Sequence, residues 1–276
     1  MATEQQVERH YASAGIAARL LAALREVNGP DAPVTVDALA PLDHFHGRGV
    51  LATEELAARL KPQPGEHLLD VGSGIGGPAR WLAAKFGCRV TGVDLTAEFC
   101  AAAEALNAAA GLADRVEIRH GSALALPVPD AAFDAAYSQN VVMNIADKAG
   151  FYREAFRSLR PGGRLALSNL CAGAAGEPVY PVPWAVTAST SFLDTPEQMR
   201  AALAAAGFEI VSFRDTSADN VTGQQRNRER LERDGLPRLG VHLILGERLR
   251  EMQINSARNL EEGRTATVEA LLRRPG

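Results

Sequence analysis

The sequence predicts an α/β fold in which a mostly parallel β-sheet is covered on both faces by crossover helices. From residue 65 onward, short apolar runs alternate with longer amphipathic segments, which is the pattern of parallel strands joined by helices. A glycine-rich turn, Gly72 to Gly77, lies at the first strand-to-helix junction. The 276 residues are 46% hydrophobic, enough for one sizeable core. We therefore expect a single domain spanning residues 1–276.

Residues 1–64 are expected to form a helical cover ahead of the sheet. One apolar helix face is indicated by residues that recur every three or four positions, at Ile16, Leu20, Leu21 and Leu24. A second helix is expected from about Val50 to Leu60. The Pro- and Gly-containing segment 61–65 then breaks the helical pattern.

Residues 65–215 are expected to form the cofactor-binding core. Its predicted strands are His67–Val71, Arg89–Val93, Val116–His120, Phe133–Ser138, Arg164–Ser168 and Glu209–Phe213. Its predicted helices are Pro78–Phe86, Ala97–Ala110, Lys148–Leu159 and one that begins with a capping box at Thr195 and ends at Gly207. Two charged, amphipathic helices in 216–263 are expected to form a lid, and 264–276 should hold the last strand, Thr265–Leu271.

Composition and charge exclude several classes of function. The net charge of −4 and the pI of about 5.9 argue against a nucleic-acid-binding protein. No stretch approaches the ~20 apolar residues of a membrane-spanning helix, and the polar N-terminus is unlike a signal peptide. The three cysteines lack disulfide or zinc-ligand spacing. We expect a cytoplasmic protein with no bound metal, a small-molecule substrate, and no nucleic-acid or membrane partner. A homodimer is possible.

The glycine-rich turn fits two cofactor-binding patterns. Gly72, Gly74 and Gly77 satisfy Gly-x-Gly-x-x-Gly of dinucleotide-binding folds, whereas Gly72, Gly74 and Gly76 satisfy Gly-x-Gly-x-Gly of methyltransferases. Asp70 stands two residues before the first glycine. A carboxylate there would repel a pyrophosphate but suits a ligand that carries an ammonium and a sulfonium group. The position of Asp70 therefore favours S-adenosylmethionine.

Three further strand ends carry side chains suited to a nucleoside. Asp94, 22 residues after Gly72, ends the second predicted strand, where a carboxylate can accept hydrogen bonds from both ribose hydroxyls of either cofactor. Apolar residues follow Gly121 and Ser122 at the end of the third strand. Gln139 and Asn140 end the fourth strand, at the point where the strand order of such sheets reverses and ligands bind.

These segments, in this order and spacing, resemble class I S-adenosylmethionine-dependent methyltransferases over about residues 65–215. The resemblance implies a Rossmann-like seven-stranded sheet whose last strand is antiparallel. It also implies that the glycines approach the methionyl part, Asp94 the ribose, and Ser122 with Ala123 the adenine. Many relatives carry an acid where this chain has Ser122. The expected cofactor-binding residues are Tyr11, Asp70, Gly72, Ser73, Gly74, Asp94, Leu95, Gly121, Ser122, Ala123, Gln139 and Asn140.

Within that class, the chain looks most like the sarcosine/dimethylglycine, phosphobase and tocopherol methyltransferases. His10-Tyr11 resembles their tyrosine-bearing N-terminal segment, which folds over the cofactor. Phe45-His46-Gly47 resembles their His-Gly element ahead of the helix that precedes the sheet. The match over 215–276 is loose.

The candidate catalytic residues are His46 and His44, which flank Phe45 in a glycine-containing loop. Methyl transfer is an in-line displacement that needs alignment, exclusion of water and, for some acceptors, removal of a proton. An imidazole titrates near neutrality and could remove that proton. The alternative is that either histidine caps a helix or bonds to the backbone.

The candidate substrate-binding residues are Tyr180, Trp184, Phe192 and Arg258. The three aromatic residues follow the fifth predicted strand and could form an apolar or cation-accepting wall, although ordinary packing under a loop remains the alternative. Arg258, in the predicted lid, is a candidate for binding an anionic group.

The sequence therefore predicts an enzyme that transfers a methyl group from S-adenosylmethionine to a nitrogen, oxygen or carbon atom of a small molecule. A nicotinamide-dependent oxidoreductase is one alternative, but it would need a Tyr-x-x-x-Lys or similar proton relay, which the sequence lacks. A non-catalytic binding module is another, but a degraded glycine loop or a missing ribose acid would be expected there.

Overall fold

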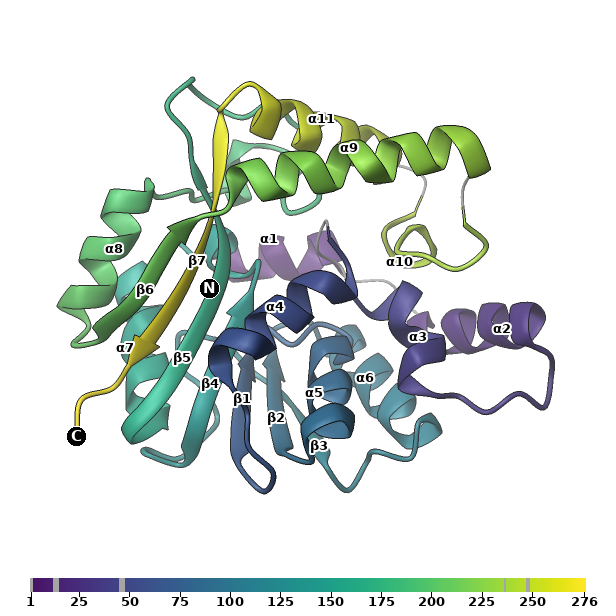
Figure 1. The fold of residues 1–276 in the computed structure, drawn as a ribbon, viewed down its shortest axis with the longest axis horizontal. Coiled ribbons are helices and arrows are strands. Elements are labelled where there is room, and N and C mark those ends of the chain that lie inside the picture. The colour runs from purple at the N-terminus through teal and green to yellow at the C-terminus, as the bar shows by residue number, and fades with distance from the viewer. Residues whose placement is uncertain (1, 12–14, 45–47, 236, 247–248) are drawn as a thin grey trace.

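A seven-stranded sheet with the order β3-β2-β1-β4-β5-β7-β6 forms the centre of the computed structural model, which describes residues 2–11, 15–44, 48–235, 237–246 and 249–276 (Figure 1). The strands are β1 (His67–Val71), β2 (Arg89–Asp94), β3 (Val116–His120), β4 (Phe133–Gln139), β5 (Leu159–Ala172), β6 (Glu209–Asp215) and β7 (Thr265–Arg273). Only β7 runs antiparallel to its neighbours, β5 and β6. The predicted Rossmann-like sheet with an antiparallel last strand is confirmed.

Helices cover both faces of this sheet. The helices along the chain are α1 (Ala2–Tyr11), α2 (Ile16–Asn28), α3 (Val36–Asp43), α4 (Val50–Leu60), α5 (Gly77–Phe86), α6 (Ala97–Ala109), α7 (Lys148–Ser158), α8 (Pro196–Ala205), α9 (Ser217–Asp234), α10 (His242–Leu245) and α11 (Leu249–Glu261). Apolar residues of α4, α5 and α6 pack on one face, and those of α7 and α8 on the other. No described helix is long and apolar enough to cross a membrane.

The longest departure from the predicted elements is β5, which extends well beyond the predicted Arg164–Ser168. Its partner β7 pairs with it from Arg164↔Arg273 to Ala172↔Thr265, so both strands continue past the carboxyl ends of the others. The long helices α9 and α11 lie across this projecting pair (Figure 1). The insert before β7 also contains the short helix α10, where two helices were predicted.

A buried ion pair joins the N-terminal helices to the sheet layer. Asp43, the last residue of α3, lies 2.6 Å from Arg80 of α5 through Oδ1 and Nη2. Arg80 is fully buried, and it also donates to the side-chain oxygen of Asn107 on α6, at 2.8 Å. Burial raises the pKa of Asp43, and Arg80 opposes that shift. Because His44 follows Asp43 directly, this pair fixes where the chain leaves α3.

Candidate active site

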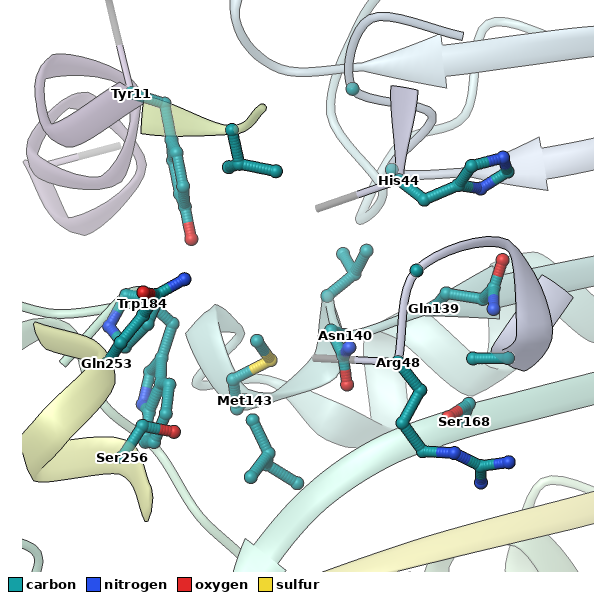
Figure 2. A pocket seen from close by; sticks show the side chains of 18 of the residues that line it. Tyr11, His44, Arg48, Gln139, Asn140, Met143, Ser168, Trp184, Gln253 and Ser256 are labelled. Atoms are coloured by element: carbon teal, nitrogen blue, oxygen red, sulfur yellow. The ribbon is translucent and has the colours of Figure 1, made fainter. Parts of the chain in front are cut away.

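A pocket of about 2380 Å³ opens at the carboxyl ends of the parallel strands. Its floor comes from the strand ends, and its walls come from α1, the start of α4, α9 and α11. Figure 2 shows His44, Arg48, Gln139 and Ser168 on one side of this pocket, opposite Trp184 and α11. The pocket therefore collects residues from segments that are far apart in the sequence.

The glycine loop between β1 and α5 forms one end of the pocket. Gly72, Gly74 and Gly76 all have positive φ angles, of 81°, 54° and 79°, which side-chain-bearing residues rarely adopt. A Cβ atom on Gly72 would also lie 2.2 Å from a methyl group of Val141. Glycine is therefore required at Gly72 for two reasons, its backbone conformation and its close contact.

Asp94, at the end of β2, holds this loop in place. Its Oδ2 accepts a hydrogen bond from the Gly74 N–H at 2.7 Å, and its Oδ1 accepts one from the Thr96 N–H at 2.9 Å. Burial raises the pKa of the carboxyl, and these two amides oppose the shift. Each carboxylate oxygen can accept a further bond, and Asp94 lines the pocket. The donor and acceptor pattern therefore fits a pair of ribose hydroxyls.

Asp70 and Ser73 lie below the pocket surface rather than in its lining. Asp70 is 3% exposed and accepts a 2.9 Å hydrogen bond from the Tyr137 hydroxyl, and burial raises its pKa to about 8. Ser73 is also buried, and its hydroxyl has no hydrogen-bond partner within the described chain. Direct contact of either side chain with a cofactor remains a prediction.

Helix α1 closes the nucleoside end of the pocket. The Tyr11 hydroxyl donates to Asn144 Oδ1 at 3.3 Å, and burial raises its pKa well above the ordinary value. Glu4 accepts a hydrogen bond from the Ser122 hydroxyl. Glu4 thus brings a carboxylate to the strand end where the family resemblance implies an acid. Four of the predicted cofactor-binding residues line this end: Leu95, Gly121, Ser122 and Ala123.

His44 heads a hydrogen-bonded chain at the opposite end. Its Nδ1 lies 3.0 Å from Thr53 Oγ1, and the Thr53 hydroxyl donates to Gln139 Oε1 at 3.4 Å. The tautomer of His44 decides which atom of the His44–Thr53 pair donates. Burial is the main reason that the pKa of His44 falls to about 4. His44 is therefore neutral near pH 7. His46 lies outside the described residues.

Of the predicted substrate-binding residues, the structure brings Trp184 and Arg258 to the pocket. Trp184 is held by its indole N–H, which donates to Ser191 Oγ at 3.0 Å. Arg258 lines the pocket from α11 and pairs with Glu262 at 2.7 Å. Tyr180 packs against the buried cluster that contains Trp184, and Phe192 bonds through its main chain to Met143. Neither of these two side chains is in the described lining.

Gln139 and Asn140 both line the pocket at the end of β4. Asn140 has a φ of 54°, and its N–H donates to the Ser168 carbonyl at 2.8 Å. The strained turn directs the chain away from the sheet at the position where β4 and β1 lie side by side. This is the strand-order reversal at which the sequence predicted a ligand.

Residues 69–167 match the model of a family described as a methyltransferase domain. This segment contains the glycine loop, Asp94 and the β4 end. The predicted resemblance to the S-adenosylmethionine-dependent methyltransferases is confirmed for this segment.

Relatives of known name agree with this family. The chain is 33% identical over 174 residues to O-methyltransferase resE of Aspergillus sclerotiorum, covering 61% of this chain and 64% of that protein. It is 37% identical over 141 residues to methyltransferase GfsG of Streptomyces halstedii, covering 51% and 48%. The matches thus span between about half and two thirds of these relatives' lengths.

A solved structure matches over nearly the whole chain. It is a geranyl diphosphate C-methyltransferase from Streptomyces coelicolor A3(2), with a TM-score of 0.72 and 19% identity, covering 99% of this chain and 98% of that one. At this identity the likeness shows the fold. The similarity of fold extends beyond the methyltransferase domain to the N-terminal helices and the insert before β7.

Several pocket residues near the methyltransferase domain were not singled out by sequence analysis. They are Glu4, Arg48, Asn144, Ser168, Gln253, Ser256 and Glu269. Most lie in helices or loops whose position depends on tertiary contacts. Among the described residues, no group of three His, Cys, Asp or Glu side chains is arranged to hold a metal ion.

Proposed function

We propose that this protein transfers a methyl group from S-adenosylmethionine to a nucleophilic atom of a small molecule. The observation that carries the proposal is that one pocket joins the glycine loop and Asp94 at one end to His44 and Trp184 at the other. A nucleoside cofactor and an acceptor molecule can therefore be bound side by side in the same pocket. The similar C-methyltransferase structure is described as a complex with S-adenosyl-L-homocysteine, which supports this cofactor.

The residues of the glycine-loop end fit the proposed cofactor. Asp94 would accept hydrogen bonds from the ribose hydroxyls, and the main chain at Gly72 and Gly74 would lie against the methionyl part. Ala123 offers an apolar surface for the adenine ring, and the carboxylate of Glu4 beside Ser122 can accept a bond from the adenine amino group. When bound, the cofactor supplies an electrophilic methyl group on a sulfonium centre.

The acceptor is proposed to be a neutral amine, phenol or similar nucleophile, held between the His44–Gly49 loop and the segment around Trp184. Neutral His44 can accept a hydrogen bond from the nucleophile and orient it, because the Thr53–Gln139 chain fixes the imidazole. Alignment in a closed pocket can supply roughly 7–11 kcal/mol of rate acceleration. His46 stays our candidate for removing a proton or orienting the acceptor.

Calorimetric titration with S-adenosylmethionine and, separately, with NADH tests the proposed cofactor. We expect binding of the first and none of the second, because residues 69–167 match a methyltransferase domain. Tighter binding of NADH would favour the oxidoreductase alternative. Transfer of labelled methyl from bound S-adenosylmethionine to a small-molecule fraction would separate an enzyme from a binding module.

Replacement of His46 by alanine tests the catalytic proposal. We expect His46→Ala to lower kcat by about 10²–10⁴ while the affinity for S-adenosylmethionine stays nearly constant. If His46→Ala kept the wild-type kcat across the pH range, His46 would have no catalytic role. Turnover should also survive a metal chelator; loss of activity with rescue by magnesium would contradict the metal-independent mechanism.

A further inference from the structure

A row of three polar side chains crosses the sheet beneath the acceptor end of the pocket. Gln139 on β4 pairs with Ser168 on β5, and Ser168 pairs with Glu269 on β7. Residues that are directly paired on neighbouring strands project from the same face of a sheet. All three residues line the pocket, and Figure 2 shows Gln139 and Ser168 with Arg48 on one side of it.

The row has hydrogen-bonding capacity that the described residues do not use. The Gln139 amide nitrogen Nε2 is buried and donates to no atom of the described chain. Glu269 is 6% exposed; its Oε2 lies 2.6 Å from Arg59 Nη2 in an ion pair, yet this buried oxygen accepts no hydrogen bond of good geometry from the described residues. Buried polar groups in native proteins nearly always have partners. The row is therefore suited to a polar group of a ligand.

The charges around the row favour a neutral hydrogen-bond donor over an anion. Three arginines around the row have carboxylate partners: Arg59 pairs with Glu269, Arg48 with Glu55, and Arg214 with Asp219. The side chains of Arg226 and Arg250, which also line the pocket, are exposed to solvent. A phosphate in this position would meet the Glu269 carboxylate without a free cation from these three arginines. A hydroxyl group, by contrast, can donate to the carboxylate and accept from the Gln139 amide.

The rest of this chamber is largely apolar. Leu170 lies two residues after Ser168 on the same face of β5, and further walls come from Met143, Trp184, Leu249 and Ile254. The pocket volume of about 2380 Å³ exceeds the roughly 300–1000 Å³ of ordinary small-molecule sites. A bound cofactor would therefore leave space for an acceptor with a substantial apolar body.

We propose that Gln139, Ser168 and Glu269 form a recognition site for a hydroxyl group on a largely apolar acceptor. Glu269 accepts the hydroxyl proton in a hydrogen bond, and Ser168 and Gln139 bond to the hydroxyl oxygen or to an adjacent polar atom. The apolar body lies against Met143 and Trp184. This inference rests on the proposed methyl transfer and names the class of acceptor for the same pocket.

Three probes that share one apolar body test this inference: 2-naphthol, 2-methoxynaphthalene and 2-naphthyl phosphate. Their affinities are measured by calorimetry on the full chain saturated with S-adenosylhomocysteine. We expect wild type to bind the naphthol at least about tenfold more tightly than the ether, because only the hydroxyl can donate to Glu269. The phosphate should bind more weakly than the naphthol.

Two variants and one control test whether the preference for naphthol over the ether arises from the row of Gln139, Ser168 and Glu269. Glu269→Gln should remove most of the naphthol preference, and Ser168→Ala should reduce it. Glu66→Gln is the matched control, because Glu66 is also paired with an arginine, Arg164, but lies outside the pocket lining. It should keep the wild-type preference. If Glu269→Gln fails to fold, Ser168→Ala carries the test.

Four results would overturn the hydroxyl site: no binding of any probe by wild type, equal affinities for naphthol and ether, tighter binding of the phosphate, or an unchanged preference in both variants. S-adenosylhomocysteine binding is measured in every sample. Failure of wild type to bind this nucleoside would instead contradict the proposed methyl transfer. The two proposals therefore fail by different measurements.

Discussion

The two ends of the pocket are built in different ways. The cofactor end uses mainly main-chain geometry and one carboxylate within a short stretch of sequence, from the Gly72 loop to Ala123. The acceptor end draws side chains from the start of α4, the end of β4, helix α11 and strand β7. Main-chain geometry demands glycines at fixed spacing, so the first end is visible in sequence. The second end exists only after the chain has folded.

The largest predicted effect concerns the buried ion pair that joins the N-terminal helices to the sheet layer. Arg80→Met should lower the free energy of unfolding by about 3–5 kcal/mol, because it leaves the Asp43 carboxylate buried without a counter-charge. Urea unfolding measures this. Arg273→Met, which breaks the half-exposed pair with Glu209, is the control and should cost about 1 kcal/mol or less. Similar losses of unfolding free energy in both variants would show that the buried pair contributes no more to stability than an exposed pair.

The next effect isolates the cofactor end. Asp94→Ala should weaken S-adenosylmethionine binding by about 2–4 kcal/mol, because charged hydrogen bonds to the ribose and the support of Gly74 are both lost. Asp130→Ala, which removes an exposed carboxylate paired with Arg157, should leave the affinity unchanged. An unaltered calorimetric affinity in Asp94→Ala would refute the ribose assignment.

A pH dependence of stability should arise beneath the glycine loop. The folded-state pKa of Asp70 is raised from 3.8 to about 8, so between these values the folded protein holds a proton that the unfolded chain has released. The free energy of unfolding should therefore fall as pH rises through this window. Asp70→Asn should show a shallower fall than wild type between pH 5 and 8, in urea unfolding without cofactor. Equal slopes would mean that Asp70 is ionised in the folded state.

The smallest predicted effect would sharpen the comparison by showing that the cofactor end also uses a distant segment. Glu4→Gln should weaken S-adenosylmethionine binding by about 1 kcal/mol, because a carboxylate beside Ser122 is a better acceptor for the adenine amino group than an amide. Glu8→Gln, on the same helix but outside the pocket lining, is the control. If the two variants bind equally well, α1 closes the pocket without contacting adenine.

Sequence patterns located every strand of the sheet because each strand is a short apolar run between turns. They underestimated β5 because Gly162 and Gly163, just before the predicted Arg164–Ser168, are typical turn residues, and because the pairing of β5 with β7 spans about a hundred residues. At the site, Asp94 and the glycine loop could be predicted from sequence, because both are defined by residues close together in the chain at strand ends. The Thr53 partner of His44 and the Glu4 partner of Ser122 were not, since both pairs depend on tertiary packing.

Glu269 is different, because the sequence did contain a signal for it. It interrupts the apolar run of the last strand, and a charge in the interior of a central strand must be paired or functional. The sequence analysis predicted the strand Thr265–Leu271 but did not single out Glu269 within it. A single carboxylate in such a run is a feature to examine in other sequences of this fold.

The position of β7 between β5 and β6 has a consequence for synthesis of the chain. β6 is translated first but pairs only with β7, so it has no place in the sheet until α9, α10, α11 and β7 have left the ribosome. At ~5–20 residues per second this leaves β6 without its neighbour for several seconds. The polar ends of β6 reduce the risk that another chain pairs with it meanwhile. The floor of the acceptor chamber, which includes Glu269, is thus completed later in translation than the cofactor end.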